Sequence, residues 1–171
     1  MPLMDVIYPQ GALAEAAKGE LLETLWSTCL RWEAVPETAA TASIAWVYLD
    51  ERPAGSISVG GAQLSQNIYR VHVRVMSGFM DQSRIAGMVD DLTKAILRAD
   101  GGSGDGSGPR VFCIVEEVPS GTWGVDGAVW DSVATARAVG ADPARISAME
   151  RAIAKSPRID VAASRIAEPA L

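Results

Sequence analysis

The residue best suited to do chemistry is the second one, a proline in the opening stretch MPLMDVIYP. A small residue at position 2 normally allows the initiator methionine to be removed, which would leave Pro2 with a free secondary amine. An amino-terminal amine has an ordinary pKa of about 8, so modest tuning makes it a base near neutral pH. The alternative interpretation is that Pro2 only begins a strand, where a missing N–H costs little.

A second group of candidates shares one predicted strand, 69–76, whose sequence YRVHVRVM alternates strictly between polar and apolar residues. Arg70, His72 and Arg74 therefore lie on one face of that strand. We predict that the two arginines bind a substrate carboxylate through their N–H groups. For Arg74 the alternative is an ion pair with Asp5 on a neighbouring antiparallel strand. We interpret His72 as a structural, hydrogen-bonded histidine.

The composition is typical of a globular protein. The chain has 171 residues, 49% hydrophobic and 21% charged, which is enough to bury a sizeable core. Its net charge of −6 argues against a nucleic-acid partner, because phosphate binding needs a basic face. Cys29 and Cys113 show neither metal-site nor disulfide spacing, and we expect no metal and no cofactor. The sequence shows no signal peptide and no run of about 20 apolar residues, so we expect no membrane contact and a cytoplasmic location.

The apolar pattern indicates an internal repeat. A shift of 67 residues superposes the two halves without a gap, taking Leu25 to Leu92 and Val47 to Ile114. Each half reads as strand, helix, strand, and a tandem βαβ duplication explains this economically. We expect parallel strands within each unit and both helices on one face of a four-stranded sheet. The predicted segments are 3–8, 13–32 and 43–49 in the first half, and 69–76, 81–99 and 110–118 in the second.

The remainder of the chain carries weaker signals. Glycines around Trp123 in the stretch 121–127, GTWGVDG, predict a hairpin, and we interpret Asp126 as a turn residue. Asp142 and Pro143 predict the start of a short helix over 142–156. We expect a flexible loop at 100–109, a loosely attached tail over the last dozen residues, and packing roles for Trp26, Trp32 and Trp46.

A βαβ duplication that begins at Pro2 resembles the tautomerase superfamily, in which the amino-terminal proline is the catalytic group. The resemblance spans residues 2 to about 130. It points to the group of cis-3-chloroacrylic acid dehalogenase, which has two fused halves and a helical C-terminal extension. The stretch 51–63, ERPAGSISVGGAQ, is similar to that group's connector between the halves. The stretch 121–127 is similar to the hairpin GHFGIGG of 4-oxalocrotonate tautomerase.

The resemblance implies an α+β fold with a tautomerase-like domain over 1–130, built from the pseudo-repeats 2–51 and 69–118. Residues 131–171 would form a helical extension and tail. It also implies a homotrimer, and a pocket where Pro2 meets the end of the third strand and the hairpin. Trp123 would then contact the substrate.

Several positions depart from the family pattern. Cys29 stands where the dehalogenase has a histidine, and Val75 and Gly78 stand where it has its two substrate arginines. Val125 stands at the position of its water-activating glutamate, with Asp126 next in the chain. The proline is therefore kept, while almost every named partner of the proline is replaced.

The sequence predicts an isomerase of the keto–enol tautomerase type, acting on a small 2-oxo acid or its dienol. Pro2 would be the acid or base, and Arg74, Arg70 and Trp123 would bind the carboxylate substrate. One alternative is a hydratase or dehalogenase of a small unsaturated carboxylic acid. Another is a trimeric binding protein that has lost turnover. The pKa of the Pro2 amine decides between the base and acid roles.

Overall fold

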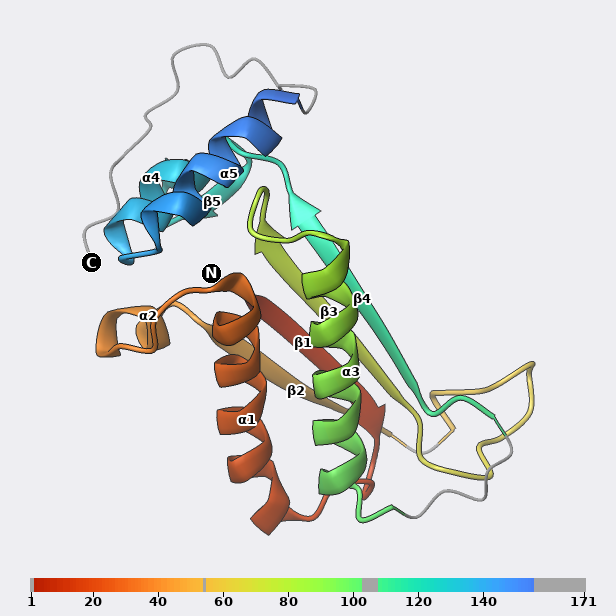
Figure 1. Ribbon diagram of the computed structural model, residues 1–171. Coiled ribbons are helices and arrows are strands. Elements are labelled where there is room, and N and C mark those ends of the chain that lie inside the picture. Colours follow the sequence, from red (N-terminus) through yellow and green to blue (C-terminus); the bar gives the residue numbers. More distant parts are fainter. Residues whose placement is uncertain (1, 54, 103–107, 156–171) are drawn as a thin grey trace.

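The structure is a computed structural model that describes residues 2–53, 55–102 and 108–155. Its centre is a four-stranded sheet in the order β2-β1-β3-β4, with the two long helices α1 and α3 on one face (Figure 1). The predicted α+β fold is confirmed. These elements are β1 (Leu3–Pro9), α1 (Glu15–Glu33), β2 (Trp46–Arg52), β3 (Tyr69–Met76), α3 (Gln82–Ala99) and β4 (Val111–Val118).

The strand pairing is that of two joined βαβ units. β1 is parallel to β2, β3 is parallel to β4, and the two units meet where β1 runs antiparallel to β3. The carboxylate of Asp81 accepts the backbone N–H of Arg84 at 3.0 Å and so caps the start of α3, as its position predicts. The tandem βαβ architecture predicted from the repeat is therefore confirmed.

The repeat needs one correction, in the second strand of each half. Trp46 and Phe112 occupy equivalent positions opposite the central strands, so the second strands are related by one residue fewer than 67. The gap-free match of Val47 with Ile114 is wrong, because Val47 packs against the core while Ile114 is 50% exposed. A one-residue slip reverses which face every side chain of a strand occupies.

The core lies between the sheet and the two long helices. Alternate residues of the central strands point toward the helices and are fully buried, among them Met4, Val6, Val71 and Val73. From the helices, Leu25 and Cys29 of α1 and Met88, Leu92 and Ile96 of α3 complete the cluster. Fully burying a side chain of this size stabilises the fold by roughly 1.5–3 kcal/mol.

The opposite face of the sheet is open in the single chain, and large apolar side chains lie on it. Trp46 is 58% exposed and Phe112 is 66% exposed, with Tyr48 and Ile114 beside them in the same two strands. The prediction that Trp46 packs within the chain's own core is wrong, because its strand position points it to this open face. These four residues are referred to below as the open-face patch.

The C-terminal third adds a hairpin and two helices at one end of the sheet (Figure 1). The predicted hairpin is present as β5 (Trp123–Val125) and β6 (Ala128–Trp130), joined by Asp126 and Gly127 with φ of 48° and 79°. Positive φ at both central residues is the pattern of a tight hairpin turn, so the interpretation of Asp126 as a turn residue is confirmed.

Of the two helices beyond the hairpin, α5 (Pro143–Lys155) was predicted and α4 (Ser132–Ala138) was not. α5 packs directly on the turn after β3, where a Cβ added to Gly78 would lie 3.2 Å from Cβ of Met149. A short helix between α1 and β2, α2 (Ala39–Ser43), was also not predicted. The middle of the predicted loop and the predicted tail lie outside the described residues.

Among the helices of the described residues, none is both long enough and apolar enough to cross a membrane.

Candidate active site at the amino-terminal end

Pro2 lies at the beginning of β1, in the interior of the fold. It is buried, and its carbonyl oxygen accepts the backbone N–H of Trp46 at 3.2 Å. Side chains alternate along a strand, so Pro2 shares the helix-covered face with Met4 and Val6. Figure 1 shows this end of β1 beside the last turn of α1 and facing α5.

A buried carboxyl group lies at the same end of the molecule. The helix of a βαβ unit runs opposite to its strands, so the last residue of α1, Glu33, returns to the level of Pro2. Glu33 is 0% exposed. Burial raises the pKa of its carboxyl, while the positive charges of the amino terminus and of Arg145 act in the opposite direction.

Glu33 was missed in the sequence, although a signal for it was present. Leu21, Leu25 and Cys29 form the buried stripe of α1 at intervals of four residues, and Glu33 is the next member of that series. A carboxylate on an apolar stripe is costly unless it has a partner or a function.

An arginine from the C-terminal extension approaches this end of the sheet. Arg145 of α5 donates from Nη2 to the carbonyl oxygen of Gly78 at 3.0 Å and to that of Phe79. Its Nε is buried and has no hydrogen-bond partner within the described part of the chain. Burial, and then the charge of Arg84, lower the pKa of the Arg145 guanidinium.

The turn between β3 and α3 is held from both sides. Glu117 of β4 accepts the backbone N–H groups of Gly78, at 2.8 Å, and Met80, at 3.2 Å. Gly78 has φ of 87°, which favours glycine. Arg84 of α3 donates to the carbonyl oxygen of Trp32 at 2.6 Å and so ties the start of α3 to the end of α1. The turn after β3 and the end of α1 are thus held by ionic side chains of β4, α3 and α5.

The structure does not bring the predicted carboxylate-binding arginines together with Pro2. Arg70 and Arg74 lie on the open face of the sheet, whereas Pro2 lies on the helix-covered face. Arg74 instead forms the ion pair with Asp5 that was predicted as its alternative role, at a distance of 2.9 Å. Arg74 also lies 3.6 Å from Glu116, and His72 is hydrogen-bonded to the same carboxylate at 2.8 Å.

Two further sequence candidates have clear positions. Trp123 is half-buried in β5, opposite Trp130, and packs against the hydrophobic core. Its hairpin lies on the same side of the molecule as α5 (Figure 1). Cys29 is fully buried, and burial raises the pKa of its thiol well above the ordinary range, which fits an inert packing residue.

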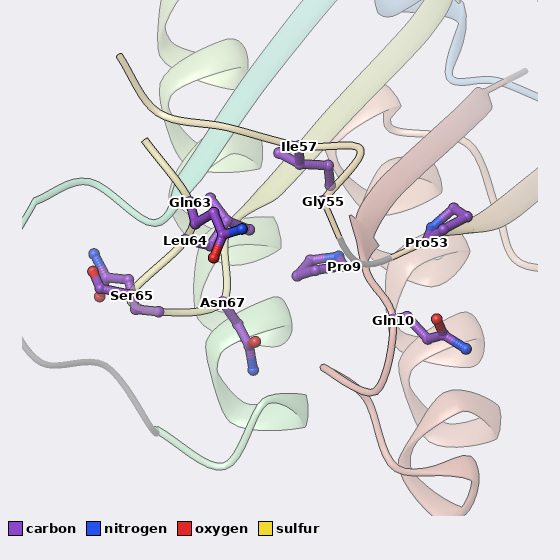
Figure 2. A pocket seen from close by; sticks show the side chains of 10 residues that line it. Pro9, Gln10, Pro53, Gly55, Ile57, Gln63, Leu64, Ser65 and Asn67 are labelled. Atoms are coloured by element: carbon purple, nitrogen blue, oxygen red, sulfur yellow. The ribbon is translucent and has the colours of Figure 1, made fainter. Parts of the chain in front are cut away.

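A cavity of about 450 Å³ lies at the opposite end of the sheet, between the turn after β1 and the connector that joins the halves (Figure 2). Pro9, Ile57, Leu64 and Asn67 are among its lining residues, all of which are uncharged. Without a titratable side chain in its wall, this cavity offers no acid–base chemistry of its own. The ionic groups at the end of the sheet where β1 begins make the amino-terminal end the better candidate.

Comparisons with known proteins match the fold. No protein-family model and no curated protein sequence matches the chain. A solved fused 4-OT that forms a symmetric trimer is 25% identical, with a TM-score of 0.56 over 72% of this chain and 90% of that one. Pt0534, in a structure inactivated by 2-oxo-3-pentynoate, is 19% identical, with a TM-score of 0.61 over 77% of this chain and 97% of that one.

A third similar structure is N1, a member of the cis-3-chloroacrylic acid dehalogenase family. It is 14% identical, with a TM-score of 0.58 over 74% of this chain and 81% of that one. The chain therefore has the architecture of fused 4-OT proteins, and the resemblance to the tautomerase superfamily that the sequence indicates is confirmed at the level of the fold.

Proposed function

We propose that this chain is an enzyme of the tautomerase superfamily that uses the amine of Pro2, freed by removal of Met1, as its acid–base group. The substrate class is a small 2-oxo acid or its dienol. The observation that carries the proposal is the buried position of Pro2 at the same end of the fold as a buried carboxyl, in a fold shared with fused 4-OT proteins. A similar protein is inactivated by 2-oxo-3-pentynoate, itself a 2-oxo compound.

In the proposed isomerisation the neutral amine takes a proton from the carbon next to the substrate carbonyl. The products of that step are the secondary ammonium of Pro2 and a dienolate. The ammonium then returns the proton to another carbon of the dienolate, so the amine ends as it began. A positioned acid–base group of this kind contributes about 10²–10⁴-fold to the rate.

The substrate carboxylate needs a cation on the same side of the sheet as Pro2. Arg145 meets this requirement better than Arg74, because Arg74 lies on the other face in an ion pair with Asp5. The buried Nε–H of Arg145, without a partner among the described residues, is a donor that a carboxylate would satisfy. Trp123 is proposed as an apolar wall of the same pocket.

We also propose a homotrimer. The open-face patch is too apolar to remain exposed at no cost in a stable monomer, and a second copy of the same sheet is the natural cover. Three of the similar structures are trimers of fused 4-OT. Sedimentation is expected to give three chains of 18.0 kDa each. A stable monomer at micromolar concentration would contradict the proposal.

The hydratase or dehalogenase alternative is favoured by one observation, the buried carboxyl of Glu33 at the level of Pro2. A carboxylate close to the amine favours the ammonium form, and an ammonium is the acid needed to protonate carbon when water adds to a double bond. A panel of small enols and unsaturated carboxylic acids, assayed by ultraviolet absorbance, separates the two reactions.

The proposed function is tested by mass spectrometry after incubation with 2-oxo-3-pentynoate. The wild type is expected to have lost Met1 and to carry one adduct, located on Pro2 by fragmentation. Pro2→Ala keeps a primary amine but loses the fixed φ of proline, and is expected to lose about 10²-fold or more in kcat/KM. Retention of Met1, or a Pro2→Ala enzyme as fast as wild type, would exclude the proposed function.

A further inference from the structure

We propose that Glu33 is the proton partner of the Pro2 amine, and that the two groups share a single proton at neutral pH. The inference rests on the proposed function, since it needs the amine that removal of Met1 would free. It assigns to Glu33 the task of keeping both forms of the proline accessible: the amine, which acts as a base, and the ammonium, which acts as an acid.

The geometry comes from the fold of the first half. α1 ends at Glu33, at the same end of the sheet where β1 begins, and both Glu33 and Pro2 are buried there. Arg84 fixes the carbonyl of Trp32, the residue before Glu33, at 2.6 Å, so the end of the helix is held in place. Successive Cα atoms are about 3.8 Å apart, so removing Met1 places the terminal amine only one residue further along.

In the second half of the fold, the residues equivalent to Glu33 and Pro2 have a purely structural role. The shift of 67 residues takes Glu33 to Asp100 and Pro2 to Tyr69. There the hydroxyl of Tyr69 donates to Asp100 at 2.6 Å, so the first residue of the strand reaches the acid at the end of the helix. In the first half the residue at that strand position is Pro2, whose free amine would be the donor.

Electrostatics limit the pair to one proton. With no proton, the pair is a buried carboxylate beside a neutral amine; with two, it is a buried ammonium beside a neutral acid. Either state leaves a net charge on the buried pair, whereas one shared proton leaves a neutral pair or an ion pair. Burial raises the pKa of Glu33, which brings its affinity for the proton toward that of the amine.

Other titratable and charged groups also surround the pair, and one of them, Arg145, is a cation that acts on Glu33. Cys29, one turn earlier in α1, is a neutral thiol because burial raises its pKa. Arg145 is the cation that faces Glu33 from α5, and its Nη2 is engaged by backbone carbonyl oxygens. Around Arg145 lie Arg84 of α3, its N-cap residue Asp81, and Glu117 of β4.

Both reactions balance with this pair. In isomerisation the proton starts on Glu33, the neutral amine takes the C–H proton, and the ammonium returns it to the new carbon. In hydration the proton starts on Pro2: the ammonium protonates one carbon of the double bond, water adds to the other, and the Glu33 carboxylate takes the proton that water releases.

The inference is tested by ¹⁵N NMR of protein labelled with [¹⁵N]proline, followed from about pH 4 to 10. Of the nine prolines only Pro2 would carry an amine, since the others are amides, so its resonance reports protonation without any assay. In Glu33→Gln the amine is expected to lose its proton about one pH unit or more below the wild-type value. Glu20→Gln, an exposed position on the same helix, is the matched control and is expected to titrate as wild type.

A second variant moves the titration the other way and covers the case in which Glu33→Gln does not fold. Arg145→Met removes a cation that faces the pair, so both groups should hold the proton to higher pH. If neither variant shifts the titration of Pro2, the pairing with Glu33 is wrong. That result leaves the proposed function intact as long as Met1 is removed and Pro2→Ala is inactive, so the two failures are distinguishable.

Discussion

Each half of the fold has an acidic residue at the end of its long helix, but the surroundings of the two residues differ. Asp100 at the end of α3 accepts the Tyr69 hydroxyl at 2.6 Å and the Asn67 amide at 2.9 Å, and it forms an ion pair with Arg110. Glu33 at the end of α1 is buried at the end of the sheet where β1 begins, and the charge of Arg145 acts on it. One acid is built into the scaffold, and the other lies where a reactive amine would be.

The difference shows how a duplicated fold can separate stability from chemistry. Burial raises the pKa of Asp100, but hydrogen bonds from Arg110, Tyr69 and Asn67 outweigh it and lower the pKa overall, so this carboxylate stays ionised. For Glu33 burial dominates, and the pKa is raised. A carboxyl with a raised pKa holds its proton to higher pH and can exchange it with a neighbouring amine, whereas an ionised carboxylate can only hold its neighbours in place.

The largest expected effect on stability comes from replacing Asp100, the acidic residue with a structural role. Asp100→Ala leaves the guanidinium of Arg110, whose side chain is only 11% exposed, without its carboxylate. The free energy of unfolding is expected to fall by about 3–5 kcal/mol, measured by urea denaturation. Asp90→Ala, at an exposed position of the same helix, is the control and should leave stability nearly unchanged. An Asp100→Ala protein as stable as wild type would remove the contrast between the halves.

The next largest effects on stability are expected at two glycines, one in each long helix. A Cβ on Gly87 of α3 would lie 2.0 Å from Cη2 of Trp32, whose ring is held by a 2.8 Å bond from Nε1 to Asp91. Gly87→Ala is expected to cost about 1–3 kcal/mol by overpacking. A Cβ on Gly19 of α1 meets nothing within 4 Å, so Gly19→Ala should instead stabilise by about 0.5–1 kcal/mol.

Both glycine variants are measured by thermal and urea unfolding of the purified protein. A rise in stability for Gly87→Ala would mean that Trp32 does not pack between the helices as described. A fall for Gly19→Ala would mean that this part of α1 is covered, for instance by a second subunit.

Much of the fold could be predicted because helical periodicity is a strong signal. The shift of 67 residues held through both helices, where Leu25 and Leu92 mark the same buried stripe. It failed by one residue in the second strands because β4 is apolar on both faces, so its inward positions could not be told from its outward ones. Trp46 was misplaced for the same reason, since an apolar residue on an open sheet face looks like a core residue in sequence.

The surroundings of the candidate site were harder to predict because they depend on long-range packing. Glu33 and Arg145 are separated by most of the chain, and only the docking of α5 on the turn at Gly78 brings them to one end of the sheet. Asp131 was a visible cap for the missed helix α4, whose seven residues are too few to show a clear period. Pro2 remains a prediction, and its local sequence is what suggested it.

The smallest effect is a change in how stability depends on pH, and it follows from the sign of the Asp100 shift. The pKa of Asp100 is lower in the folded protein than the ordinary value of about 3.9, so folding favours the ionised form. The stability it contributes is fully present above that ordinary value and is lost as pH falls through the folded pKa. Asp100→Asn keeps the size of the side chain but has no charge to lose.

The difference in unfolding free energy between wild type and Asp100→Asn isolates this one group, because every other carboxyl is common to both proteins. The difference is expected to be constant between pH 7 and about 5 and to shrink below about pH 4, measured by urea denaturation at each pH. A difference that stays the same down to pH 3 would mean that Asp100 is held by shape and neutral hydrogen bonds alone. Asp100 and Glu33 would then differ in their hydrogen-bond partners but not in their charge state. The contrast between a structural acid and a proton-exchanging acid would fail.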